Sequence, residues 1–357
     1  EVMVMDEMTE PREAYVLNRG VYDDLLDPVE PGTPSAVLAW DEDNQANRLG
    51  LSQRLFDPEN PLPARVAVNR YWQHYFGTGL VKTTDDFGSQ GERPSHPQLL
   101  DWLASTFISS GWDIKSLQKL MVMSATYQQS SAADQEALSA DPENRLLARG
   151  PKNRLKAESL RDLALSASGL LVSEIGGPSV KPYQPEGLWA YNAVSSKYDQ
   201  GHGADLYRRS MYTFWKRTNP PPSMNIFDAP SRAYCVVRRE KTTTPLQALV
   251  LMNDPQYLEA ARVLGQRIME QAETVQHRII LGYRLLTGRT PRPEELQLLE
   301  EQFQEVIEGA RQHPGKAGTL ASIGEFNNTT KDQPAELAAY TTVMSTIMNF
   351  DATTMKR

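Results

Sequence analysis

The chain has 357 residues, 37 basic against 45 acidic side chains and a net charge of −8, a length that suits one large or two medium domains. The acidic balance argues against a nucleic-acid partner, because phosphates require a cationic face, and no apolar run of about 18 residues is present to span a bilayer. The single cysteine excludes a disulfide framework, a thiolate zinc cluster and a c-type haem attached to this chain.

Residues 1–45 are predicted to form an extended arm. Short strands are expected at residues 2–5 and 14–17, and Pro28, Pro31 and Pro34 suit a polyproline II connection. The opening EVMVMDEMTE lacks the charged region that begins a signal peptide. We interpret the arm as a linker from a missing upstream domain of a longer precursor.

The first predicted helix begins at Asn60 as its cap, with Pro61 at the first helical position, and ends at Gly77. A capping box of Ser95 and Gln98 predicts the start of a second helix.

Two more helices follow from capping and spacing. Asp113 is predicted to cap the third, and apolar spacing predicts a fourth over residues 157–171. A long Gly/Pro-rich loop covers residues 176–203, where Trp189 and Tyr191 favour an ordered structure. The alternation across residues 211–215 suits a half-buried strand.

The C-terminal part has the clearest helix starts. Thr244 and Gln247 form a capping box with Pro245 at the first position, and Asp254 followed by Pro255 restarts a helix. Further helices are expected through residues 279–286, 296–307 and 337–348.

The predicted fold class is mainly α: a multi-helix globular body with a small β component and long ordered loops, preceded by the extended arm. We expect residues 46–357 to form a single, mainly helical domain.

A basic segment interrupts the acidic chain between residues 207 and 241. Clustered like charges repel one another, which indicates that the segment has a function. Its arginines could hold a carboxylate or sulfate through their planar forks, or they could pair with the surplus carboxylates of the chain. Neighbouring aromatic side chains could stack on sugar rings or belong to the core. The ligand-binding candidates are Arg208, Arg209, Arg217, Arg232, Arg238, Arg239, Trp189, Tyr191, Tyr212 and Trp215.

Three side chains are candidates for chemistry. Asp228 could act as a base or acid, or could pair with Arg232 or pin a turn before Pro230. Cys235 lies between arginines that would favour its thiolate, although most free cysteines are buried structural residues. His202 could approach it in space as a base.

No metal site is predicted, because the histidines have neither HExxH nor HxH spacing. Walker, Rossmann and GxSxG signatures are also missing, which argues against nucleotide-dependent and α/β-hydrolase chemistry. The histidines are His74, His96, His202, His277 and His313.

Several long motifs resemble one known family. They are RVAVNRYWQHYFGTGLVKTTDDFGSQGERPSHPQLLDWLA, FDAPSRAYCVVRREKTTTPLQALVLMND, LLTGRTPRPEEL and, in the arm, EMTEPREAYVLNRGVYD. The chain is identified by them as a member of the planctomycete cytochrome-associated domain of unknown function called PSD-one. Where that family usually has Thr-Asn-Thr-Pro, this chain has Thr242, Thr243, Thr244 and Pro245.

The resemblance implies a setting rather than a reaction. Such domains form the C-terminal part of large exported proteins that carry a c-type cytochrome module, so a periplasmic or otherwise exported location is expected. No cofactor is expected in this chain, and a c-type haem is expected on an upstream segment or a partner chain.

The sequence is compatible with three functions. The first is a module of a cytochrome-linked assembly that binds or oxidises a carbohydrate at the Arg/aromatic/Asp cluster, which as an enzyme would be part of an oxidoreductase. The second is a non-catalytic scaffold or interaction domain that docks the cytochrome partner. The third is a hydrolase or lyase acting on an anionic polysaccharide, with Asp228 and either His202 or Tyr207 as the acid/base pair.

Overall fold

The computed structural model describes residues 3–10, 12–41, 43–191 and 197–356, with only the backbone described at 190 and 191. The chain divides into two compact units. Unit 1 comprises Glu1–Gln129 and Ala133–Arg149, and unit 2 comprises Ser130–Ala132 and Gly150–Arg357. This border falls inside the expected domain of residues 46–357, whose extent stays a prediction.

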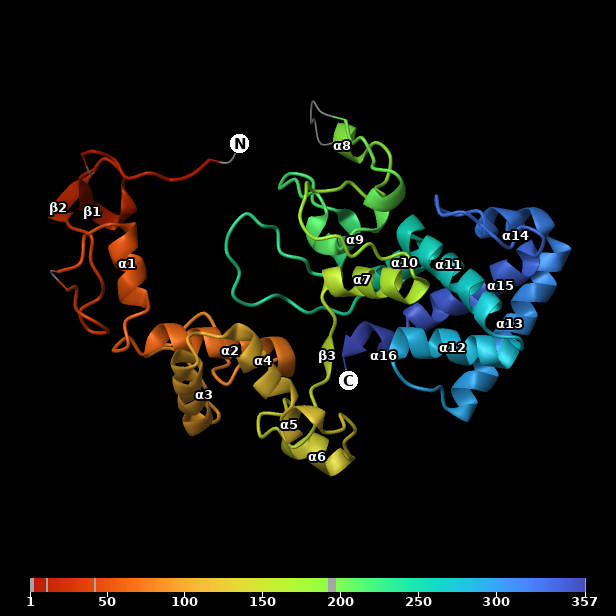
Figure 1. Cartoon of the computed structure of the whole chain (residues 1–357), viewed down its shortest axis with the longest axis horizontal. Helices are drawn as coiled ribbons and strands as arrows, with labels where there is room; N and C mark the ends of the chain where they lie inside the picture. Colours follow the sequence, from red (N-terminus) through yellow and green to blue (C-terminus); the bar gives the residue numbers. More distant parts are fainter. Residues whose placement is uncertain (1–2, 11, 42, 192–196, 357) are drawn as a thin grey trace. The chain divides into compact units, whose positions relative to one another are not determined.

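Unit 1 begins with an antiparallel hairpin, in which Ala14 pairs with Val29, and continues with short helices (Figure 1). The strand expected at residues 14–17 is therefore confirmed, whereas residues 3–5 of the other expected strand have no regular structure. Its elements are β1 (Ala14–Leu17), β2 (Leu25–Val29), α1 (Arg48–Leu55), α2 (Leu62–Phe76), α3 (Pro97–Ser109), α4 (Ile114–Val122), α5 (Ala125–Gln128) and α6 (Gln135–Ala140).

The core of unit 1 joins α2, α3 and α4 through apolar side chains at helical spacing. Asn69, fully buried on α2, fixes the following loop by exchanging two hydrogen bonds of 2.9 Å with the backbone of Val81. The apolar side chains that meet are Val68, Trp72 and Phe76 of α2, Leu100, Leu103 and Phe107 of α3, and Leu117 and Met121 of α4.

The predicted caps in unit 1 have mixed outcomes. Asp113 caps α4 by accepting a hydrogen bond from the Ser116 N–H, as predicted. The capping box of Ser95 and Gln98 is wrong, because Pro97 occupies the first helical position of α3 and its neighbour His96 becomes the cap.

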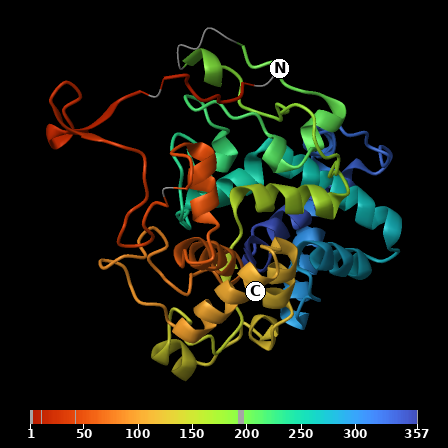
Figure 2. The same cartoon turned by 60° about the vertical axis from the view of Figure 1, so that its left-hand side comes forward.

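Unit 2 is built around helices that gather in both views of the cartoon (Figures 1 and 2). Its helices are α7 (Ala157–Ser168), α8 (Leu188–Tyr191), α9 (Pro222–Ile226), α10 (Pro245–Asn253), α11 (Pro255–Gln271), α12 (Val275–Thr287), α13 (Pro293–Gln312), α14 (Pro314–Ala321), α15 (Pro334–Met348) and α16 (Asp351–Thr354). Its other elements are β3 (Asn153–Arg154), β4 (Met355–Lys356) and the 3₁₀ turns η2 (Gly203–Tyr207) and η3 (Ser210–Tyr212).

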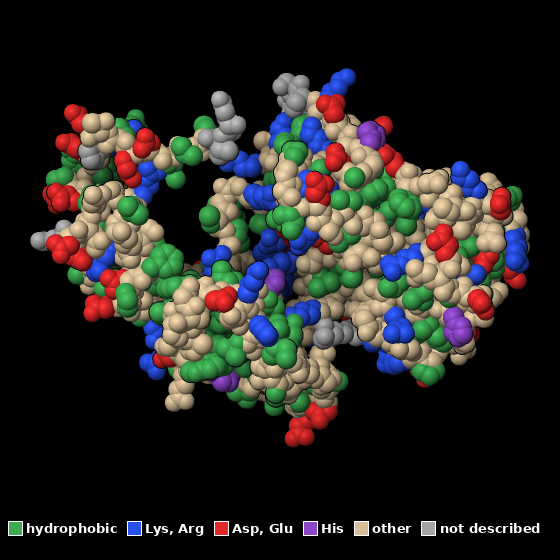
Figure 3. Space-filling view, viewed as in Figure 1, with side chains coloured by type: hydrophobic (Ala, Val, Ile, Leu, Met, Phe, Trp, Pro, Cys, Tyr) green, Lys and Arg blue, Asp and Glu red, His purple; other side chains and the backbone are tan. Residues whose placement is uncertain are grey.

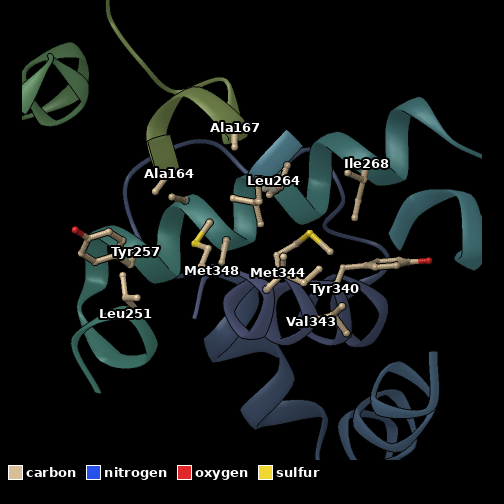
Figure 4. Close-up of a cluster of buried hydrophobic side chains, with 14 of the residues drawn as sticks. Ala164, Ala167, Leu251, Tyr257, Leu264, Ile268, Tyr340, Val343, Met344 and Met348 are labelled. Carbon is tan, nitrogen blue, oxygen red and sulfur yellow. The ribbon is translucent and has the colours of Figure 1, made fainter. Parts of the chain in front are cut away.

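The centre of unit 2 is the contact between α11 and α15. Figure 4 shows Leu264 and Ile268 of α11 on the side that faces Tyr340 and Met344 of α15, and all four side chains are fully buried. Burial of each such side chain contributes about 1.5–3 kcal/mol.

The predicted helix starts in unit 2 are confirmed. The capping box of Thr244 and Gln247 begins α10, and Asp254 caps α11 through the Gln256 N–H. The strand expected over residues 211–215 is wrong: η3 occupies its start, and Thr213 makes only an isolated bridge with Val180. In the described residues the sheets are the pairs β1–β2 and β3–β4, so the mainly α fold class is confirmed.

Two helical glycines give a matched test of this packing. A Cβ at buried Gly282 of α12 would lie 2.8 Å from the Met344 Cε in the core, whereas a Cβ at Gly309 of α13 would meet open space. We expect Gly282→Ala to lower the free energy of unfolding by about 1–3 kcal/mol, and Gly309→Ala to raise it by about 0.5–1 kcal/mol. Urea unfolding measures both, and a stabilising Gly282→Ala would contradict the packing described here.

Candidate functional site

The basic segment does not form one cluster of arginines. Arg208 is buried, and its guanidinium donates to the carbonyl oxygens of Pro178, Glu174 and Gly176 and lies 3.9 Å from the centre of the Tyr212 ring. The Tyr212 hydroxyl in turn accepts from the Gly176 N–H at 2.8 Å. This pair fixes the loop after residue 173 and leaves no side of Arg208 open to a ligand.

A second buried arginine, which the sequence analysis missed, binds the backbone next to Arg208. Arg161 of α7 is fully buried and donates to the carbonyl oxygens of Leu206 and Arg208 at 2.6 and 2.7 Å. Its neighbour Asp162 accepts from the Ser210 N–H at 2.7 Å and lies 3.9 Å from Arg209. Arg161 and Asp162 therefore hold the backbone between η2 and η3.

The aromatic candidates lie in several places. Trp189 is only 6% exposed, and its indole N–H donates to the Gln184 Oε1 at 3.1 Å. The indole N–H of Trp215 donates to the Ser231 carbonyl, and Arg232 lies 4.7 Å above its ring. The side chain of Tyr191 falls outside the described residues.

Tyr207 belongs to another buried group. Its hydroxyl donates to Glu259 Oε1 at 2.8 Å, and the same oxygen accepts from the Phe326 N–H. Burial, with the Glu259 carboxylate, raises the pKa of Tyr207 well above its usual range. A phenol so held stays neutral at ordinary pH, which makes Tyr207 unsuited to act as a base.

The candidates for chemistry are not brought together. Cys235 is exposed, and His202 pairs with Glu325 at 2.6 Å. Among the described residues, neither a hydrogen bond nor an ion pair joins His202 to Asp228 or to Cys235. The described residues also hold no group of three or more His, Cys, Asp or Glu side chains arranged to bind a metal ion.

Asp228 closes a loop. Its carboxylate accepts from the Thr242 N–H at 2.7 Å and from the Thr242 hydroxyl at 2.9 Å. Gln247, fully buried at the start of α10, then donates to the Thr242 hydroxyl at 3.2 Å and to the Ile226 carbonyl at 2.9 Å. We call these three residues, Asp228, Thr242 and Gln247, the clasp.

The clasp joins the two ends of residues 229–241, which run as one long loop between α9 and α10 (teal in Figure 1). Such closed loops are often functional. Lys and Arg side chains gather over this part of unit 2 (Figure 3). The outer part, residues 231–238, is exposed throughout, and we call it the exposed loop.

The C-terminal end of the loop borders a small pocket of about 30 Å³ in unit 2. Of the predicted site residues, Asp228 and Arg239 line this pocket together. Arg239 also pairs with Glu158 of α7 at 2.7 Å. Arg217 and Arg238 are exposed, with no hydrogen bond or ion pair found for them within the described residues.

A comparison with known protein families identifies the family of the chain. The family model described as PSD1, protein of unknown function (DUF1553), matches residues 47–303. The chain belongs to this family. The PSD1 match includes all three clasp residues and every residue that lines the pocket. It confirms the resemblance, and it assigns no activity.

No curated protein and no solved structure matches the chain. Within the described residues, no helix is long and apolar enough to cross a bilayer.

The clasp can be tested with two variants of Asp228, which lies at φ 60°. Asp228→Ala removes the acceptor oxygens and puts alanine in a left-handed conformation, so we expect a loss of about 2 kcal/mol in the free energy of unfolding. Asp228→Asn keeps one acceptor and tolerates this conformation, so its loss should be about half as large. Urea unfolding measures the losses, and limited proteolysis should show faster cleavage of the loop in Asp228→Ala. Equal behaviour of Asp228→Ala and wild type would contradict the clasp.

Proposed function

We propose that this PSD1 chain is an exported, periplasmic module of a c-type-cytochrome-linked assembly, and that it docks the haem-bearing partner through the exposed loop. The partner is a haem-bearing upstream segment of the same precursor or a separate chain. The observation that carries the proposal is the composition of the loop, which exposes apolar side chains between arginines.

The apolar part of the exposed loop suits the centre of an interface. Tyr234 is 74% exposed, and Val236 and Val237 are 37% and 40% exposed. Solvent exposure of such side chains is unfavourable, and their burial against a partner is a source of binding free energy. Tyrosine and arginine are also the residue types enriched in the most important interface contacts.

The charges of the loop indicate the kind of partner. Arg232 and Arg238 flank the apolar residues, so an apolar patch bordered by acidic groups would be complementary. Because the clasp already holds both ends of the loop, less conformational entropy is lost when the partner binds.

The exposed cysteine provides a direct test. Cys235 is the only cysteine of the chain and lies within the exposed loop, so a maleimide photo-cross-linker attached to it will report contacts at this position. In periplasmic extracts of the native host, we expect a cross-linked product that contains this chain and stains for covalently bound haem.

The matched control moves the thiol from the exposed loop to an exposed position on a helix. Cys235→Ser combined with Glu308→Cys places it on α13, and this variant should give no haem-stained product. Equal haem staining from both positions, or none from Cys235, would contradict docking through the exposed loop.

A second proposed function is the binding of a carbohydrate, which would then be the substrate of the redox assembly. The observation that favours it is the pocket that Asp228 and Arg239 share. The pocket does not bring a second acid/base side chain from the predicted set beside Asp228, so we propose binding at this position rather than hydrolysis or elimination.

A further inference from the structure

We infer that the pocket of unit 2 binds an oxyanion group, a carboxylate or a sulfate, on a ligand that also carries hydroxyl groups, as an acidic saccharide does. The inference rests on the second proposed function, carbohydrate binding, and is independent of docking through the exposed loop. The residues that line the pocket are Arg154, Leu155, Lys156, Phe227, Asp228, Arg239, Glu240 and Lys241.

Basic side chains reach the pocket from two segments that are distant in sequence. Arg154 and Lys156 come from β3 and the residue before α7, and Arg239 and Lys241 come from the C-terminal end of the loop. The clasp, through Thr242, fixes the residue that follows Lys241. Four basic side chains face two acidic ones, Asp228 and Glu240, around a small volume, and Glu158 pairs with Arg239 from outside the lining, so basic groups are still in excess. The balance favours an anionic ligand.

The two arginines are held in place and retain donors. Arg154 Nη1 donates to the Thr243 hydroxyl at 3.1 Å, while its buried Nε has no hydrogen-bond partner among the described residues. Arg239 uses Nη1 for Glu158. A guanidinium has five N–H donors in a fixed fork, so an arginine fixed by one contact can still bind an oxyanion with the others.

The surroundings of the pocket lower the pKa values of its two lysines. Each lysine as a whole is exposed, but burial around the ammonium group lowers the pKa of Lys156. The positive charges of Arg239 and Lys241 lower this pKa further, whereas the negative charge of Glu158 raises it. Burial also lowers the pKa of Lys241. An anion in the pocket would favour both protonated forms and relieve this repulsion.

Asp228 is the side chain of the pocket that would accept a hydrogen bond from a hydroxyl group of the ligand. Its oxygens accept from Thr242 but keep further lone pairs, which could accept from a hydroxyl and would repel an anionic group. The anion would therefore lie toward the basic side chains and a hydroxyl toward Asp228. Leu155 and Phe227 supply an apolar edge of the pocket.

The test compares three ligands at constant ionic strength, because salt screens such contacts. They are galacturonate, inorganic sulfate and neutral galactose, each titrated calorimetrically. We expect galacturonate to bind more tightly than either of the others. Lys241→Gln should weaken its binding about tenfold, while Arg238→Gln, which removes a nearby charge that does not line the pocket, should leave it within about twofold.

The outcomes separate this inference from the function on which it rests. If galactose binds as tightly as galacturonate and Lys241→Gln changes neither, carbohydrate binding holds and the oxyanion inference is wrong. Sulfate binding alone would show a site for inorganic oxyanions and overturn the saccharide assignment. If no ligand binds, or if Arg238→Gln weakens binding as much as Lys241→Gln, the pocket is not the site.

The pH dependence gives an independent readout. The pKa values of Lys156 and Lys241 are lowered in the free protein, and an anion binds their protonated forms better. The affinity for galacturonate should therefore fall as the pH rises from about 7 to about 10, toward the usual lysine range. A constant affinity across this interval would contradict the assigned role of the lysines.

Discussion

The clasp of Asp228, Thr242 and Gln247 is the interaction on which the surface of unit 2 depends. It joins α9 to the start of α10 by side-chain hydrogen bonds and so closes the loop between them. Gln247 contributes twice, because it also forms the capping box that begins α10. The positions of Arg239 and Lys241 at the pocket follow from this closure, since the loop returns to the body at Thr242.

The basic segment serves three physical purposes. Arg208 is buried and binds backbone carbonyl groups. Arg239 and Lys241 line the pocket, and Glu158 compensates part of the charge of Arg239. Arg238 is exposed to solvent on the exposed loop, and Arg232 is exposed there beside the Trp215 ring. Charges that are close in sequence are thereby distributed over the interior, the pocket and the surface, which limits their mutual repulsion.

The features that sequence reasoning could predict are local ones. Helix starts at Asp113, Thr244 and Asp254 depend on contacts within three residues, and all three are confirmed. The box at Ser95 failed because the adjacent Pro97 sets the first helical position.

Contacts between residues that are distant in sequence could not be predicted in the same way. Arg161 meets the Arg208 carbonyl 47 residues away, and Glu259 meets the Phe326 N–H 67 residues away. The role of Asp228 could not be predicted either, because its partner Thr242 follows 14 residues later, whereas the sequence analysis considered the nearby Arg232 as its partner. The shared family motif did indicate this region, since it runs from Phe227 to Asp254 and contains the whole clasp.

An absorption spectrum gives the most direct test of the proposal that the exposed loop docks a haem-bearing partner. The chain would be purified under mild conditions from its native host, as wild type and as the double variant Tyr234→Ser with Val237→Ser. Docking through the exposed loop predicts a Soret band that co-purifies with the wild type and is lost in the variant, while both chains stay folded. A colourless wild type, or an equal Soret band in both preparations, would contradict it.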